Sequence, residues 1–184
     1  MRHAAPVRRE LGVATVMNLL GPLGNPAGVR RQVIGVADPA RGPLMARALA
    51  RLGVEHAMVV HADAGMDEIA PSGPTRVWEV VGGPGAPRIS EWTLDPGAYG
   101  MAHDDLDALA GGEPEHNADR LERLLTEPGA DPAGRAAVVL NAAAAIYVSG
   151  VVESFGDAVQ YARLALEDGR AMAVLERLRQ EGGK

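Results

Sequence analysis

Residues 33–62, VIGVADPARGPLMARALARLGVEHAMVVHA, decide the fold class of this chain. The apolar run at 33–38 is typical of a buried strand. The segment 43–53 has the composition of a helix, with a proline in its first turn and a glycine at its end. HAMVVHA, at 56–62, is a second apolar strand. A strand, a helix of about ten residues and another strand predict a βαβ unit, in which the two strands pair in parallel.

The flanking segments extend this α/β pattern. TRVWEVV (75–81) and RISEWTL (88–94) alternate in apolar character and are joined by the glycine-rich GGPGAP, which predicts a hairpin or two edge strands. One or two short helices are expected at 3–17. The last third is helical, and its most apolar segment should be buried because nearly every face is apolar. The predicted helices of this part are 116–127, 134–150, 155–169 and 170–180. We expect a mixed, mostly parallel sheet covered by helices.

Length and composition set the broad class. The chain has 184 residues, 47% apolar and 23% charged, which is an ordinary globular balance for one domain or slightly more. The net charge of -6 argues against general nucleic-acid binding. The sequence has no cysteine, which excludes a disulfide framework and fits a cytoplasmic protein. No apolar run reaches the length of a membrane span. From the net charge and the lack of such a run, we expect neither nucleic acid nor a membrane as a partner.

Two acids after the second strand are the first candidate site. HADAGMDEIAP, at 61–71, follows a predicted strand, and ligand sites in parallel α/β folds gather at the carboxyl ends of strands. Asp67 and Glu68 offer adjacent hard oxygen ligands of the kind that suits Mg²⁺. The alternative is a solvated acid pair that caps a helix. Asp63 is a less specific candidate, and for the nearby His61 a structural role is the favoured interpretation.

Three further features are open to interpretation. Arg8 and its neighbour Arg9 could hold a carboxylate or phosphate bidentately, or form a solvated helix face. Gly21 and Pro22 belong to the rigid corner NLLGPLGNP (18–26), which could line a ligand channel or connect two domains. Asn141, inside the apolar helix, is expected to hydrogen bond locally to the backbone.

In this order, these pieces resemble the anthranilate phosphoribosyltransferase family along essentially the whole chain. The fold implied is the catalytic domain shared by nucleoside phosphorylases and phosphoribosyltransferases. The activity implied is transfer of a phosphoribosyl group from phosphoribosyl pyrophosphate to the amine of anthranilate, in tryptophan biosynthesis and with Mg²⁺. The matching segments are VRRELGVATVMNLLGPLGNPA (7–27), QVIGVAD (32–38), HAMVVHADAGMDEIAP (56–71), LDPGAYG (94–100), GGEPEHNA (111–118) and VVLNAAAAIYVSG (138–150).

The resemblance also assigns roles to single residues. Arg8 matches the arginine that holds the anthranilate carboxylate, and Gly21 with Pro22 matches the corner that lines the anthranilate channel. Asp67 and Glu68 match the acid pair that binds Mg²⁺ near the pyrophosphate. No side chain is expected to act as a catalytic nucleophile. At the positions of Ala14 and Met17 many members carry other residues, which need not abolish function.

The resemblance further implies that the chain is a C-terminal portion. Family members begin with a helical domain and a glycine-rich phosphate loop, neither of which is present here. Residues 1–27 would be hinge helices that pack with that helical domain, and 28–184 a portion of the α/β domain. We expect the chain to be inactive alone, and a homodimer only in the complete protein. The alternatives are a related transferase, similar to pyrimidine nucleoside phosphorylases, and a non-catalytic association module.

Overall fold

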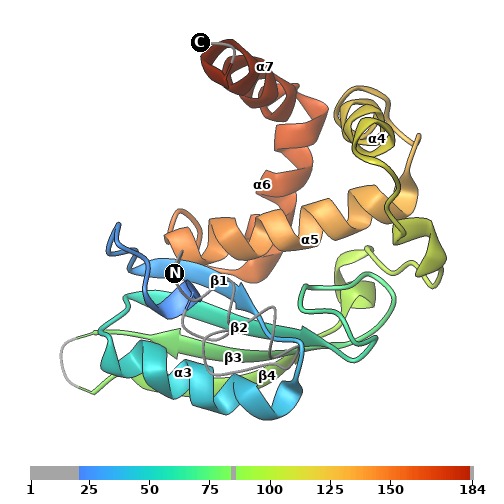
Figure 1. Cartoon of the computed structure of the whole chain (residues 1–184). Coiled ribbons are helices and arrows are strands. Elements are labelled where there is room, and N and C mark those ends of the chain that lie inside the picture. Colours follow the sequence, from blue (N-terminus) through green and yellow to red (C-terminus); the bar gives the residue numbers. More distant parts are fainter. Residues whose placement is uncertain (1–20, 84–85, 183–184) are drawn as a thin grey trace, which may run out of the picture.

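A computed structural model describes residues 21–83 and 86–182. The helices expected at 3–17 lie outside these residues. The described chain forms layers, with one helix below a four-stranded sheet and a group of helices above it (Figure 1). The α/β class predicted from the sequence is therefore confirmed.

The sheet has the strand order β1-β2-β3-β4, the same as the order along the chain. The strands are β1 (Arg31–Gly35), β2 (His56–Ala62), β3 (Thr75–Val81) and β4 (Arg88–Leu94). β1 and β2 pair in parallel across α3 (Gly42–Arg51), as the βαβ prediction requires. β2 pairs with β3 and β3 with β4 in antiparallel fashion. The hairpin prediction is confirmed, but the expected predominance of parallel pairing is wrong for these strands, because only one of the pairings has a crossover helix.

Period-two alternation along the strands divides the core into two parts. Below the sheet, Val59 and Trp78 pack against Met45 and Leu49 of α3. Gly42 lets α3 approach this closely, because a Cβ there would lie 2.2 Å from the Trp78 ring. Above the sheet, the alternate positions of β2 pack against α5 (Pro132–Ser149) and α6 (Phe155–Glu167).

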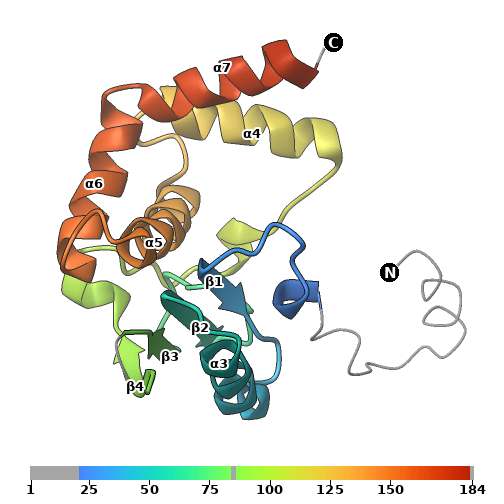
Figure 2. The same ribbon diagram turned by 90° about the vertical axis from the view of Figure 1, so that its left-hand side faces the viewer.

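Helix α5 lies between the sheet and the outer helices, as its apolar sequence predicts. Its small side chains Ala143 and Ala144 are fully buried, which allows close packing on both sides. The outer helices are α4 (Pro114–Thr126) and α7 (Arg170–Gly182), which lie side by side at the top of both views (Figures 1 and 2). Arg179 of α7 bonds to Glu122 of α4 at 2.7 Å. Short 3-10 helices occupy Pro39–Arg41 (η2), Pro96–Tyr99 (η3) and Asp107–Leu109 (η4).

A buried carboxylate joins the upper face of the sheet to α5. Glu79 of β3 accepts hydrogen bonds from His56 Nε2 at 2.7 Å and from Trp92 Nε1 at 2.9 Å. Tyr147 of α5 lies edge-on to the His56 ring, with centroids 4.9 Å apart. Burial would raise the pKa of Glu79, but the hydrogen bonds from His56, Tyr147 and Trp92 outweigh it and hold the pKa below its ordinary value. Glu79 is therefore ionised and structural.

Over residues 21–83 and 86–182, none of the helices is both long enough and apolar enough to cross a lipid bilayer.

Candidate functional site

The loop that follows β2 turns back sharply at the carboxyl edge of the sheet. The Ala62 N–H donates to Met66 O at 2.9 Å, and the Gly65 N–H donates to Ala62 O at 2.8 Å. Gly65 has a φ of 88°, a left-handed conformation that glycine adopts without steric cost. The chain then runs from Met66 to Ala70, and we call residues 63–70 the acid loop because they carry the predicted acid pair.

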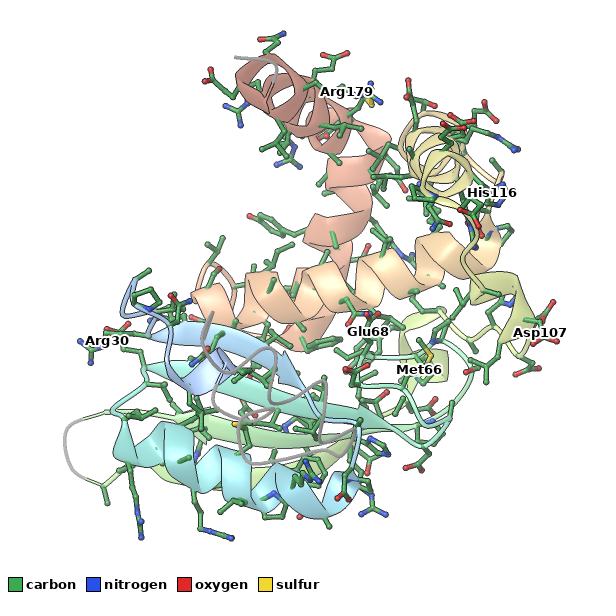
Figure 3. The ribbon with its side chains drawn as sticks, in the orientation of Figure 1. Arg30, Met66, Glu68, Asp107, His116 and Arg179 are labelled. Carbon is green, nitrogen blue, oxygen red and sulfur yellow. The ribbon has the colours of Figure 1, made fainter. Side chains whose placement is uncertain are left out.

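Asp67 and Glu68 lie where the sequence predicted them, beside the ends of the parallel strands. The backbone of the acid loop passes directly over the last residue of β1, so that a Cβ on Gly35 would lie 1.6 Å from Asp67 O. Both carboxylates are exposed. Figure 3 shows Glu68 and Met66 near the end of the sheet, below α5. The glycine at the end of β1 therefore makes the approach of the acid loop possible.

The structural role predicted for His61 is confirmed. Its side chain is buried, and Nδ1 lies 2.8 Å from Val36 O. Because a carbonyl can only accept, Nδ1 carries the proton of this hydrogen bond. The imidazole thus holds the chain that leaves β1 against the end of β2, beneath the acid loop.

The acid loop offers some, but not all, of the oxygen ligands that Mg²⁺ needs. In the described part of the chain, no group of three histidine, aspartate or glutamate side chains is arranged to hold a metal ion. Two adjacent carboxylates remain, Asp67 and Glu68. Mg²⁺ commonly binds one or two carboxylates and completes its octahedron with water and substrate phosphates. A pair of this kind would suit the ion as part of a site in which other groups supply the remaining ligands.

The corner is only partly described. Arg8 lies outside the described residues, while Gly21 is exposed and Pro22 is half-buried in a helical turn. Asn25 Oδ1 then accepts from the Ala27 N–H at 2.9 Å, which turns the chain toward β1. An open hollow of about 770 Å³ lies between this corner and α3, lined by Leu23 but by neither Gly21 nor Pro22. The expected anthranilate channel at Gly21 and Pro22 remains a prediction.

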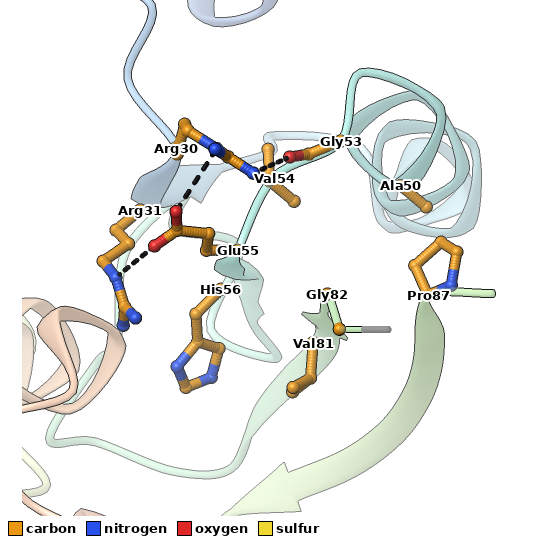
Figure 4. Close-up of a pocket in the computed structure, with 11 residues that line it drawn as sticks. Arg30, Arg31, Ala50, Gly53, Val54, Glu55, His56, Val81, Gly82 and Pro87 are labelled. Atoms are coloured by element: carbon orange, nitrogen blue, oxygen red, sulfur yellow. Dashed lines mark hydrogen bonds and ion pairs between the residues drawn. The ribbon is translucent and has the colours of Figure 1, made fainter. Parts of the chain in front are cut away.

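A second hollow, of about 500 Å³, lies at the other end of the strands (Figure 4). Arg30 and Arg31 line it, but Glu55 pairs with both, at 3.4 Å and 3.0 Å. Arg31 also donates to Val148 O at 2.8 Å and so caps the end of α5. The contacts of these arginines are therefore within the protein itself. The length of β2, about 20 Å, separates them from the acid loop.

Asn141 makes a contact with the acid loop that the sequence did not predict. Asn141 of α5 donates from Nδ2 to Ala137 O at 2.9 Å, so the predicted local bond is confirmed. It also bonds to both backbone groups of Ile69, the residue after Glu68. The sequence signal is a single amide in a helix that is apolar on nearly every face.

The sequence and the fold are similar to those of known proteins. The family described as "Glycosyl transferase family, a/b domain" matches residues 1–172. An anthranilate phosphoribosyltransferase of Thermomicrobium roseum is 48% identical, over 97% of this chain and 51% of its own. The solved anthranilate phosphoribosyltransferase of Thermus thermophilus is 44% identical with a TM-score of 0.84, over 96% of this chain and 50% of that one.

A more distant relative has been solved with ligands. The anthranilate phosphoribosyltransferase of Saccharomyces cerevisiae, in complex with PRPP and Mg, is 27% identical with a TM-score of 0.82, over 96% of this chain and 49% of that one. This chain therefore spans about half the length of the relatives it matches. The resemblance to anthranilate phosphoribosyltransferases is confirmed, and the chain belongs to the glycosyl transferase family with the a/b domain.

Proposed function

We propose that this chain is part of an anthranilate phosphoribosyltransferase and that it supplies the metal-holding acids and part of the acceptor side. The proposal is supported by the acid pair, which lies exposed at the carboxyl edge of the parallel strands on a loop held from below. Identity of 48% over 97% of the chain to a protein of that name supports the same activity. The chain spans about half of that relative, and in this proposal the activity is that of the whole enzyme of which the chain would be one part.

In this proposal Asp67 and Glu68 hold Mg²⁺ together with the pyrophosphate of phosphoribosyl pyrophosphate. The metal, when bound, would offset the negative charge that develops on the departing pyrophosphate. Arg8 would hold the anthranilate carboxylate, and Gly21 and Pro22 would line its channel. These residues bind and orient the two substrates, so that the amine faces the anomeric carbon. No side chain of this chain is required as a nucleophile.

A chimaera tests the proposal. This chain would be joined to the segment of the Thermomicrobium roseum relative that it does not match, and consumption of anthranilate would be followed with phosphoribosyl pyrophosphate and Mg²⁺. We expect turnover by the chimaera and a loss of about 100-fold or more in the Asp67→Asn/Glu68→Gln variant. The isolated chain, assayed in parallel, should be inactive.

The same assay decides the acceptor. If a folded chimaera cleaves a pyrimidine nucleoside with phosphate but leaves anthranilate unchanged, the related-transferase alternative replaces the proposal. Equal activity of the acid variant and the parent would remove Asp67 and Glu68 from the site. Substitution of Arg8 by Ala should raise the KM for anthranilate more than the KM for phosphoribosyl pyrophosphate, because only the first substrate has a carboxylate for it.

A further inference from the structure

Asn141 links α5 to the acid loop through both ends of its amide. Its Nδ2 donates to Ile69 O at 2.8 Å, and its Oδ1 accepts from the Ile69 N–H at 3.1 Å. The bond from Nδ2 to Ala137 O at 2.9 Å fixes the amide on its own helix. A side chain anchored on α5 thus satisfies both backbone groups of one residue of the acid loop.

The bonded residue directly follows the acid pair. Ile69 is fully buried, and its backbone sets the direction in which the chain leaves Glu68. On the other side of the pair, Met66 O accepts the Ala62 N–H at 2.9 Å, and Asp67 O lies over Gly35. The backbone is therefore held before, at and after the acid pair, while both carboxylates remain exposed.

We propose that Asn141 is a positioning residue for the metal ion: by holding Ile69, it presents the Asp67 and Glu68 carboxylates together and already ordered. A loop that is ordered before binding loses less conformational entropy when the ion arrives. Groups behind metal ligands commonly determine affinity in this way. This inference rests on the proposed role of the acid pair in binding Mg²⁺.

The experiment measures binding of Mn²⁺, as a probe for Mg²⁺, to the 184-residue chain as its complex with inorganic pyrophosphate, because the two carboxylates need phosphate oxygens to complete the site. Water-proton relaxation would give the affinity for the wild type, Asn141→Ala and Asp67→Ala/Glu68→Ala. Asn117→Ala is a matched control, because Asn117 holds both backbone groups of Gly112 in the same manner, each at 2.8 Å, in a different loop. We expect Asn141→Ala to bind Mn²⁺ about tenfold more weakly than the wild type, and Asn117→Ala to bind as the wild type does.

Amide hydrogen exchange gives the readout that separates positioning from general destabilisation. Asn141→Ala should speed exchange in residues 64–70, whereas Asn117→Ala should speed it only around Gly112. If Asn141→Ala is not folded by circular dichroism, Asn141→Ser replaces it. That variant keeps a polar, uncharged group but is too short to bond both backbone groups of Ile69, and the same loss of affinity is expected.

The outcomes distinguish this inference from the proposed function. Equal Mn²⁺ affinity of the wild type and Asp67→Ala/Glu68→Ala would overturn the metal assignment and the role of Asn141 with it. If the acid variant loses binding but the Asn141 variant binds as the wild type does, the acid pair stands and only the role of Asn141 fails. An equal loss in Asn117→Ala would also overturn it, because the effect would then be general.

Discussion

Replacing Gly35 by alanine places a methyl group where the acid loop passes over β1. The added Cβ would lie 1.6 Å from Asp67 O, whereas ordinary contact begins at 3.4 Å. The loop must therefore retreat by roughly 2 Å, because overlap at this distance is strongly repulsive. Such a shift takes the Ile69 N–H and C=O out of hydrogen-bond range of Asn141, since both bonds are already at ordinary length.

The expected loss follows from these two bonds. Each contributes about 1 kcal/mol, and an Asn141 amide left half-buried without its partners adds a further penalty of similar size. We therefore expect Gly35→Ala to lower the free energy of unfolding by about 3 kcal/mol. With a urea dependence of about 2 kcal/mol per molar, the unfolding midpoint should fall by roughly 1.5 M.

Equilibrium unfolding in urea, followed by circular dichroism, measures this difference. Gly83→Ala is the matched control, because a Cβ there meets nothing within 4 Å and its φ is outside the left-handed region. We expect that variant to stay within about 0.5 kcal/mol of the wild type. A Gly35→Ala midpoint equal to that of Gly83→Ala would refute the reasoning, because it would mean that the acid loop does not rest on β1.

Three further predictions concern polar groups that are buried or half-buried. The pKa of Glu79 in the folded protein lies below its ordinary value of 4.5, so the ionised carboxylate stabilises the fold above pH 4.5, and this stabilisation is lost as the pH falls through the folded pKa. Urea unfolding midpoints between about pH 6 and 3 should therefore depend less on pH in Glu79→Gln than in the wild type. Burial, with Glu79 nearby, raises the pKa of Tyr147 to about 12, so stability is lost as pH rises through that value, and an ultraviolet titration of Tyr147→Phe should lack the latest tyrosinate step. Asp131 caps α5 by accepting a hydrogen bond from the Gly134 N–H at 2.8 Å, and it also forms an ion pair with Arg120. Thermal unfolding should show that Asp131→Ala lowers the stability by about 2 kcal/mol. Asp131→Asn should lower it less, because the amide oxygen still caps the helix.

The strands show what a local pattern can predict. His56–Ala62, Thr75–Val81 and Arg88–Leu94 have the bounds expected from their apolar runs and alternation. β1 begins two residues before the predicted strand, at Arg31, whose guanidinium is held by Glu55 and by Val148 O. These partners are distant in sequence, so no local pattern reveals them. Helix α5 begins at Pro132 because Asp131 caps it, also earlier than predicted.

In the candidate site, too, the local sequence predicts some features and not others. Asp67 and Glu68 were found because a loop after a parallel strand must lie at the carboxyl edge of the sheet. The contacts of Asn141 and Gly35 with the acid loop were not predicted, since they depend on how α5 and β1 pack in three dimensions. A glycine at a strand end or an amide in a helix can have several structural roles. Which role it has depends on the residues that pack against it in the folded protein.

The bond between Ile69 and Asn141 also has a consequence for synthesis. The two residues are 72 positions apart, so the acid loop leaves the ribosome well before the helix that holds it. At a translation rate of about 5–20 residues per second, the delay is roughly 4–14 s. During that time the loop can rest on β1, but Ile69 has no partner from α5. The carboxylates are therefore made before the helix that holds them in place, and their arrangement is completed only after α5 has been synthesised.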